Sequence, residues 1–463
     1  MNRSLLTISQ ALRKGDVTSA ELTAECTHQM EIHEELHNAY KLPLPNLAST
    51  AALAADAALA CGADPGPLAG LPCSIKDLFA INGSPTFAGS SQQIPESILK
   101  QGPIIEHIRS QLGVIVGKTH TVEFAFGGIG INSHWGTPRN PWDAEQHRVP
   151  GGSSAGAGVS IIQQSALYAL GTDTAGSVRI PASFTGNVGL KTSAKRWSLD
   201  GIFPLSPTLD TPGILARSVE DTAYIFAALD PYIDESPEQF ISRLRHEESV
   251  PVLGTGEALL WEHCSPDIVN CVITCIRELE RAGAILQDTS VPEIAIAQTL
   301  LKCGNVSAAE ISEFVSTKLP SWLENLDPLV GARIKDGGSI SAAEWLTRQR
   351  QLSEISDSIT KRFEYCDFIV SPTVPISPPL LKDVSDLDDY RPANMACLSN
   401  TCAANSLTLC ALTIPVGLDQ FNMPVGLQLM APYGQEERLL ATGLWIESII
   451  GIPAERLGKA PRT

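Results

Sequence analysis

The residue pattern with the most familiar chemistry is His33-Glu34-Glu35-Leu36-His37, which fits the motif H-E-x-x-H. On a helix, the two imidazoles would lie one turn apart and could bind Zn²⁺ beside a glutamate base. A zinc enzyme needs a third protein ligand, yet no His or Glu occurs between His37 and Glu96. His33 also falls on the apolar face predicted for its own helix. We therefore expect no metal here and interpret the motif as a pair of packed or solvated histidines.

A second pattern, Gly152-Ser153-Ser154-Ala155-Gly156, fits the nucleophile elbow G-x-S-x-G and would make Ser154 the nucleophile. An elbow directly follows a buried strand, whereas residues 137–150 are polar, charged and interrupted by proline. A triad histidine should come later in the chain, and only His246 and His263 do so. No Lys-Ser or Lys-Thr follows these glycines, so they do not form a phosphate-binding loop. We expect neither a Ser154 nucleophile nor a cofactor.

A third pattern consists of three separated segments that are rich in small residues. They are Gly70-Leu-Pro-Cys-Ser-Ile-Lys76-Asp77, Pro150-Gly-Gly-Ser153-Ser154-Ala-Gly156 and Gly171-Thr-Asp-Thr-Ala-Gly-Ser177-Val-Arg-Ile-Pro181. Together with the spacing of 24 residues between Ser153 and Ser177, these segments closely resemble the amidase signature family. The resemblance also takes in the N-terminal helices and residues 136–141, 189–191, 367–373 and 423–428, and thus most of the chain.

The resemblance implies an amidase that forms an acyl-enzyme on Ser177, with Ser153 as a bridging serine and Lys76 as the base. A serine hydroxyl is a poor nucleophile until a base takes its proton. A neutral lysine can do so only if its pKa falls well below about 10.4, and burial produces such a shift. Because Lys76 follows the apolar run 71–75, we expect it at the buried end of a strand, with Asp77 on the opposite face.

The resemblance also implies the surroundings of the nucleophile. The peptide between Gly152 and Ser153 is expected to be cis, and the backbone N–H groups of Thr174, Ala175 and Gly176 are expected to form the oxyanion hole. Many relatives have Gly at the position of Ala175, which puts a positive φ there in doubt. The flanking pair formed by residues 173 and 179 is expected to shape the loop.

Substrate contacts are harder to predict. Phe126, Gly127 and Gly128 follow a predicted strand and resemble a substrate-facing segment of the family, although an aromatic residue before two glycines is as often part of a core. Ser154, next to the bridging serine, is the fourth residue that we expect to contact the substrate.

The elements that position these residues are predicted by short apolar runs and by capping patterns. Helices are predicted after Thr7 and Thr18, each of which begins a capping box, with Gly15 ending the first helix. Most of the 36 glycines lie within residues 61–220, whereas residues 231–365 are richer in amphipathic helix and are expected to cover the site. Strands are predicted at residues 71–75, 114–116, 166–170, 368–370, 407–414 and 425–430.

No linker, repeat or low-complexity tract divides the chain. We therefore predict one α/β domain over residues 1–463, with the central mixed β-sheet flanked by helices that the family resemblance implies. The net charge of −18 and the pI near 4.9 oppose binding to nucleic acid. No apolar run is long enough for a membrane span, and the N-terminal sequence does not resemble a signal peptide. The sequence thus predicts a cytoplasmic protein, whose 11 cysteines stay reduced.

Two functions remain open. The leading hypothesis is a stand-alone amidase that converts a small carboxamide to an acid and ammonia or amine. The alternative is the glutaminase subunit of a glutamine-dependent Asp-tRNA/Glu-tRNA amidotransferase, which shares the fold and the triad. The segment Phe203-Pro-Leu-Ser-Pro-Thr-Leu-Asp210 looks more like the stand-alone enzymes. The oligomeric state also stays open, with a homodimer as one candidate.

Overall fold

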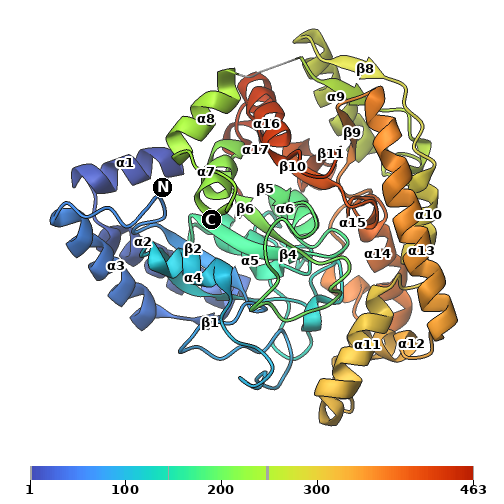
Figure 1. Ribbon diagram of the computed structural model, residues 1–463, viewed down its shortest axis with the longest axis horizontal. Coiled ribbons are helices and arrows are strands. Elements are labelled where there is room, and N and C mark those ends of the chain that lie inside the picture. The colour runs from blue at the N-terminus through green and yellow to red at the C-terminus, as the bar shows by residue number, and fades with distance from the viewer. Residues whose placement is uncertain (1–2, 144, 247–249, 462–463) are drawn as a thin grey trace.

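A computed structural model describes residues 3–143, 145–246 and 250–461. In these residues, one sheet of 11 strands runs through the molecule in the order β1-β3-β2-β4-β6-β5-β10-β11-β9-β7-β8, with helices on both sides (Figure 1). The strands are β1 (Tyr40–Pro43), β2 (Pro72–Lys76), β3 (Val114–Thr119), β4 (Tyr168–Asp173), β5 (Val188–Lys191), β6 (Thr211–Ala216), β7 (Val252–Gly254), β8 (Ile285–Gln287), β9 (Phe368–Pro372), β10 (Cys410–Leu418) and β11 (Pro424–Ala431).

The sheet is mixed, as predicted. Strand β2 is parallel to β3 and β4, and β7 is parallel to β8 and β9, whereas the pairs between β4 and β9 through the centre are antiparallel. All six predicted strands occur, but the run 407–414 is wrong at its start, since β10 begins only at Cys410. The other five strands were not predicted, because they are short or contain Gly or Pro.

Helices cover both faces of this sheet. The longer ones are α1 (Leu5–Lys14), α2 (Ser19–His37), α3 (Pro45–Ala60), α4 (Pro103–Ser110), α5 (Ala155–Ile162), α6 (Arg179–Thr185), α7 (Val219–Leu229), α8 (Pro237–His246), α9 (Pro266–Arg281), α10 (Glu293–Lys302), α11 (Ser307–Lys318), α12 (Pro328–Gly337), α13 (Ala342–Ser358), α14 (Leu387–Leu398), α15 (Cys402–Ser406), α16 (Glu436–Ile450) and α17 (Pro453–Leu457). Short 3₁₀ turns lie at Glu123–Ala125, Ala258–Leu260, Pro320–Trp322, Ile359–Glu364 and Leu381–Asp383.

Side chains along β4 alternate between the two faces of the sheet, and this alternation shows which helices cover each face. Tyr168 and Leu170 belong to the large core cluster that includes residues of α7 and α16. Ala169, which lies between them, belongs instead to a cluster that includes residues of α5. Successive side chains of a strand point to opposite faces, so α5 and α7 lie on opposite sides of the sheet. The site residues at the end of β4 are therefore held between two packed layers.

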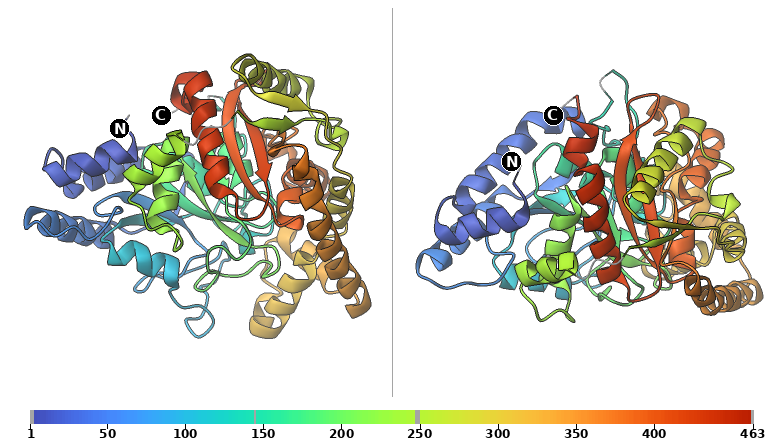
Figure 2. Two further views of the ribbon diagram at one scale, coloured as in Figure 1. Left: turned by 45° about the horizontal axis from the view of Figure 1, so that its top comes forward. Right: turned by 90° about the horizontal axis from the view of Figure 1, so that it is seen from above.

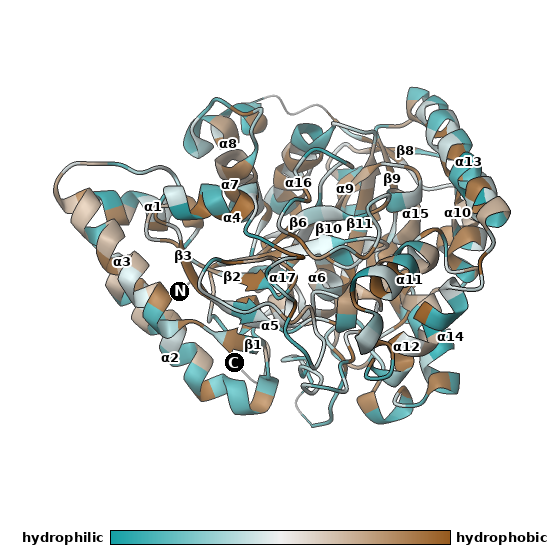
Figure 3. Ribbon diagram, turned by 60° about the horizontal axis from the view of Figure 1, so that its bottom comes forward, coloured by the Kyte–Doolittle hydropathy of each residue, from teal (hydrophilic) through white to brown (hydrophobic). Residues whose placement is uncertain are grey.

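The region 231–365 is mainly helical, as expected, but it also supplies β7 and β8 at one edge of the sheet. Helices α10 to α13 gather at one end of the molecule, where Figure 1 and Figure 2 show them beside the red C-terminal strands. Hydrophilic residues cover much of the outer helices α2 and α13 in Figure 3. None of the helices in the described ranges is long and apolar enough to cross a membrane.

The N-terminal helices test the capping predictions. The box predicted at Thr7 is wrong, because α1 already begins at Leu5 and its N-cap is Ser4. Gly15 ends this helix with φ 74°, as predicted. Thr18 caps α2 through the predicted box with Glu21. A capping box at Thr7 would have broken the amphipathic pattern of α1, whose buried face begins at Leu5.

Candidate active site

Lys76 is the last residue of β2, and its side chain is fully buried. Its Nζ donates hydrogen bonds to Ser153 Oγ at 2.7 Å and to Thr172 Oγ1 at 2.9 Å. Burial lowers the pKa of Lys76 to about 7, against the attraction of Asp210 and Asp173. The amine is thus held where it can exchange a proton with Ser153 near neutral pH.

Asp77 turns away from this amine, as strand alternation predicts. Its carboxylate pairs with Lys118 Nζ at 2.7 Å, and both side chains are fully buried. Asp77 also accepts a hydrogen bond from the backbone N–H of Phe87 at 3.1 Å. The carboxylate is therefore occupied on the other face of β2 and leaves Lys76 to the site.

Ser153 lies in the glycine-rich loop that leads into α5. The peptide between Gly152 and Ser153 is cis, as the family resemblance implies. The loop packs tightly on the 127–130 segment, where a Cβ on Gly152 would lie 2.6 Å from the backbone nitrogen of Gly130. Only glycine fits at this close approach of the two backbones. The approach holds the loop in place and thereby the position of Ser153 beside Lys76.

Ser177 follows β4 and is 3% exposed. It lines an inner cavity of about 30 Å³, which shares the wall residues Phe126, Leu301, Gly304 and Arg333 with an outer cavity of about 240 Å³. The inner wall is formed by Ala125, Phe126, Gly127, Thr174, Ala175, Ser177, Leu205, Leu301, Gly304, Ser307, Arg333 and Leu398.

Of the four predicted substrate contacts, Phe126 and Gly127 lie in this wall, whereas Gly128 and Ser154 lie behind it. Ser154 is fully buried, and its backbone N–H donates to the carbonyl of Ser177 at 3.2 Å. Gly128 donates its N–H to Asn394 Oδ1 at 2.6 Å. Both residues hold the walls in place, so any effect on substrate binding would be indirect.

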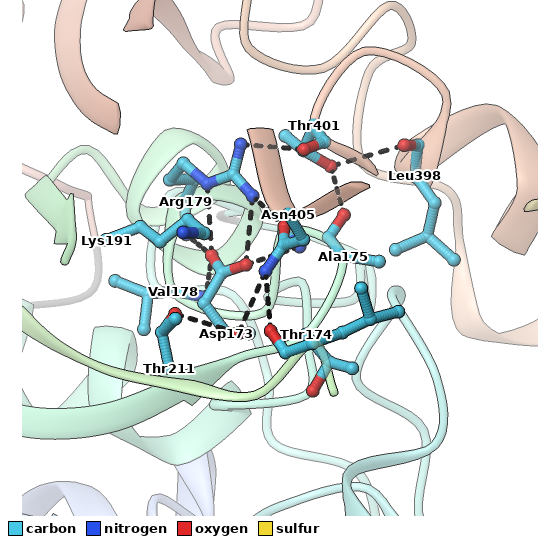
Figure 4. A network of polar contacts seen from close by, with 12 residues as sticks. Asp173, Thr174, Ala175, Val178, Arg179, Lys191, Thr211, Leu398, Thr401 and Asn405 are labelled. Carbon is cyan, nitrogen blue, oxygen red and sulfur yellow. Dashed lines mark hydrogen bonds and ion pairs between the residues drawn. The ribbon is translucent and has the colours of Figure 1, made fainter. Parts of the chain in front are cut away.

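A buried ion pair holds the loop before Ser177, as Figure 4 shows. Asp173 accepts a hydrogen bond from Arg179 Nη2 at 2.9 Å and also from the backbone N–H groups of Gly176 and Val178. Burial opposes ionisation of Asp173, but Arg179 outweighs it and lowers the pKa to about 2. This pair spans the turn from β4 into α6, as expected.

The segment expected to form the oxyanion hole follows this carboxylate. Thr174 and Ala175 line the inner cavity, and Ala175 keeps its backbone outside the region of positive φ. Gly176 has φ 135° and donates its N–H to Asp173 at 2.7 Å. The Thr174 hydroxyl donates to Asp210 Oδ1 at 2.5 Å. The N–H of Gly176 therefore already has a partner within the protein.

Asp210 and Arg333 are two further residues at the site that the sequence did not reveal. Asp210 is buried, accepts hydrogen bonds from the N–H groups of Leu205 and Ser206, and has its pKa raised to about 6 by burial. Arg333 lies in α12, with its guanidinium 3.8 Å from the ring centre of Phe126 and Nη1 donating to the Phe126 carbonyl at 2.7 Å. Asp210 ends the segment 203–210 that the sequence analysis singled out, although no role at the site was predicted for it, whereas no local pattern indicates Arg333.

The histidine pair near the N-terminus packs rather than facing this site. The rings of His33 and His37 stack with centroids 5.3 Å apart, and His37 is buried with Nδ1 3.1 Å from Gln163 Oε1. Of the two interpretations, packed or solvated histidines, the packed one describes His37, while His33 is partly exposed.

A mixed sheet that holds a buried lysine in contact with one serine, and places a second serine in the wall of a small cavity, fits a hydrolytic enzyme. A model of the amidase family matches residues 21–440, and the chain belongs to that family. The protein is accordingly an enzyme of the class that hydrolyses amides.

The relatives extend over nearly the whole chain. A 2-amino-5-chloromuconic acid deaminase of Comamonas testosteroni is 45% identical over 454 residues, which is 97% of each chain. The A subunit of a glutamyl-tRNA(Gln) amidotransferase of Ralstonia nicotianae is 30% identical and covers 94% of this chain and 95% of its own. A crystal structure of an amidase, 28% identical, superposes with a TM-score of 0.85 and covers 96% of this chain and 99% of its own.

Proposed function

We propose that this chain is a stand-alone amidase in which Ser177 is the nucleophile, Ser153 the proton bridge and Lys76 the base. The observation that carries the proposal is the contact of 2.7 Å between Lys76 Nζ and Ser153 Oγ in a fully buried pocket. A lysine whose pKa is lowered to about 7 can accept the proton that a serine nucleophile must lose.

The reaction follows from these positions. Neutral Lys76 accepts a proton through Ser153 as Ser177 Oγ attacks the amide carbonyl, and a tetrahedral oxyanion forms against the backbone of residues 174–177. Lys76 then returns the proton through Ser153 to the leaving nitrogen, which departs as ammonia or amine. Water attacks the acyl-enzyme in the same way and releases the acid. No cofactor takes part in this scheme.

The shape and charge of the cavity favour a small substrate that carries a carboxylate. The inner cavity holds only about 30 Å³, which leaves room for little more than the reacting group. Arg333 stands partly exposed in its wall. Within the described part of the chain, no carboxylate lies within ion-pair distance of this guanidinium, which is bonded to the Phe126 carbonyl and to the Tyr390 side chain, while Asp336 attracts it from farther away. A substrate carboxylate would supply a directly bonded counter-charge.

A second candidate function is the deamination of an unsaturated amino acid, and the 45% identity over 97% of each chain with the Comamonas deaminase favours it. A 2-amino-2-enoic acid can tautomerise to a 2-imino acid. Water then adds at the carbon that bears nitrogen, ammonia leaves, and a 2-oxo acid remains without any redox step. Both functions hydrolyse a C–N bond and release ammonia, and both fit a carboxylate held by Arg333.

The role of an amidotransferase glutaminase is the weaker alternative, because the relative of that kind is 30% identical.

We propose further that the enzyme works in the cytoplasm on a small molecule, with a homodimer as the candidate assembly. We also propose that residues 231–365 act as a subregion that selects the substrate, since Leu301, Gly304, Ser307 and Arg333 reach the inner wall from it.

The test is ammonia release by the purified chain from paired substrates. Succinamate and butanamide differ mainly in the distal carboxylate, and 2-aminomuconate tests the deaminase candidate. We expect turnover of an acid-bearing compound, and Arg333→Met should raise its KM by roughly 10- to 100-fold, as loss of a charge-assisted contact does.

The matched control is Arg391→Met at the outer cavity, where Arg391 is already paired with Asp336. Arg391→Met should change KM by no more than a few-fold. If Arg333→Met and Arg391→Met raise KM for succinamate equally, a carboxylate site at Arg333 is ruled out. The same holds if Arg333→Met raises KM equally for succinamate and butanamide.

A further inference from the structure

Thr401 lies between α14 and α15, far from the catalytic segments in sequence, yet its hydroxyl reaches the nucleophile loop. Its side chain is fully buried, and Oγ1 donates a hydrogen bond to the carbonyl of Ala175 at 2.6 Å (Figure 4). The carbonyl of Leu398, at 3.3 Å, is a more distant second acceptor. The short bond therefore ties Thr401 to the peptide two residues before Ser177.

The same peptide is also held at its other end. The carbonyl of Ala175 and the N–H of Gly176 belong to one planar peptide and point in opposite directions. Thr401 holds the carbonyl, and the carboxylate of Asp173 accepts the N–H at 2.7 Å. Both polar groups of this peptide are thus engaged, and its N–H points away from a bound substrate.

The two neighbouring peptides differ. Ala175 and Ser177 both line the inner cavity, and within the described ranges neither backbone N–H donates to a protein acceptor. The peptides that carry these two N–H groups adjoin the middle peptide at the Cα atoms of residues 175 and 176, so holding the middle peptide restricts their orientation to rotation about the φ and ψ bonds. Donors aimed in advance at a developing oxyanion are what this chemistry requires.

We propose that Thr401 is a positioning residue, which fixes an oxyanion hole formed by the N–H groups of Ala175 and Ser177 rather than of Gly176. The inference rests on the proposed role of Ser177 and deepens it. Thr401 is itself held in place, because Arg179 Nη1 donates to its carbonyl at 2.8 Å while Nη2 of the same side chain binds Asp173.

The close approach at Gly176 supports this assignment. A Cβ on Gly176 would lie 2.1 Å from Thr401 Oγ1, so any side chain there would displace the hydroxyl. The loop and Thr401 therefore fit each other at van der Waals contact. A hydroxyl packed against the backbone in this way can hold one peptide orientation against alternatives.

The test compares Thr401→Val with Thr401→Ser. Valine keeps the shape but loses the hydroxyl, whereas serine keeps the hydroxyl. Removing one oxyanion-hole donor costs about 10²–10³ in kcat elsewhere, so loosening two donors should lower kcat roughly 10- to 100-fold. KM should stay within about 3-fold, and Thr401→Ser should restore most of kcat. The matched control is Thr222→Val, which removes a buried hydroxyl bonded to the Ser218 carbonyl in α7.

The rate at which an active-site phosphonate labels Ser177 provides a second measurement, because that reaction also forms charge on oxygen. Labelling should slow in Thr401→Val and not in Thr222→Val. If the wild-type enzyme is not labelled at Ser177, the proposed function fails; if it is labelled and Thr401→Val is labelled equally fast, only the role of Thr401 fails. Thr401→Ala replaces Thr401→Val if the latter does not fold, and equal kcat of the Ala and Ser variants would also overturn the proposal.

Discussion

At the scale of single residues, Lys76 is a fully buried amine whose pKa burial lowers to about 7. In the proposed mechanism the neutral amine is the base, so activity should rise with pH through a limb centred near pH 7 instead of about 10.4. Lys76→Ala should remove this limb along with most of the rate. Lys76→Arg should be no better, because a guanidinium does not lose its proton. A pH profile of kcat/KM tests this, and near-normal turnover of Lys76→Arg would mean that position 76 provides only a fixed charge.

Asp210 provides a second pH test. Its negative charge raises the pKa of Lys76, in opposition to burial. Asp210→Asn removes that charge and should lower the pKa of Lys76 further, moving the limb to lower pH. The pH profile should be compared with that of Asp221→Asn, another buried carboxylate, which accepts a hydrogen bond from the Leu5 N–H and lies outside the cavity wall. A limb that stays in place in Asp210→Asn would show that this carboxylate only holds Thr174 and its own loop.

Single residues were predictable from sequence where a short motif carries them. Lys76, Ser153 and Ser177 each lie in one of the three short segments that resemble the family, and the structure brings Lys76 and Ser153 into contact. Arg333 and Thr401 lack such a motif. Arg333 reaches the cavity wall from α12, and Thr401 reaches the Ala175 carbonyl from the turn before α15, and only the fold brings them there.

At the scale of elements, the turn from β4 into α6 is where backbone geometry is most demanding. Gly176→Ala should lower the free energy of unfolding by roughly 3 kcal/mol, because φ 135° is strained for alanine and Cβ would meet Thr401 Oγ1 at 2.1 Å. Gly62→Ala is the control, since Gly62 has φ 82° but open space around it, and should cost about 1 kcal/mol. Urea unfolding measures both values. Equal losses of unfolding free energy in the two variants would mean that the contact with Thr401 adds nothing to the cost of alanine at position 176.

Strands were predictable where they contain a short run of mostly apolar residues. The runs that became β2, β3, β4, β9 and β11 are buried on both faces, and their composition shows it. Strand β6 begins Thr-Pro-Gly and β5 contains Gly189, so their sequences are typical of turns. Their strand structure depends on pairing with each other and with β4 and β10, which a local pattern cannot report.

At the scale of the whole molecule, the two halves of the chain contribute different parts of one cavity. The glycine-rich part supplies Ser177 to the cavity wall and the Lys76–Ser153 pair outside it, whereas the mainly helical part supplies Leu301, Arg333 and other wall residues. The family resemblance predicted the segments that hold Lys76, Ser153 and Ser177, and their catalytic roles stay predictions. Residues of α10 to α12 line the inner cavity together with Thr174, Ala175 and Ser177. The account predicts that substitutions in these helices change substrate selection more than the chemical step.

The central claim is that Ser177 forms the covalent intermediate, and labelling with a serine-reactive phosphonate followed by peptide mass spectrometry tests it most directly. The account predicts one adduct on Ser177, which is lost in Ser177→Ala together with roughly 10³-fold or more of kcat. An adduct on Ser154, which is fully buried behind the cavity wall, would contradict the account and revive the elbow interpretation of residues 152–156.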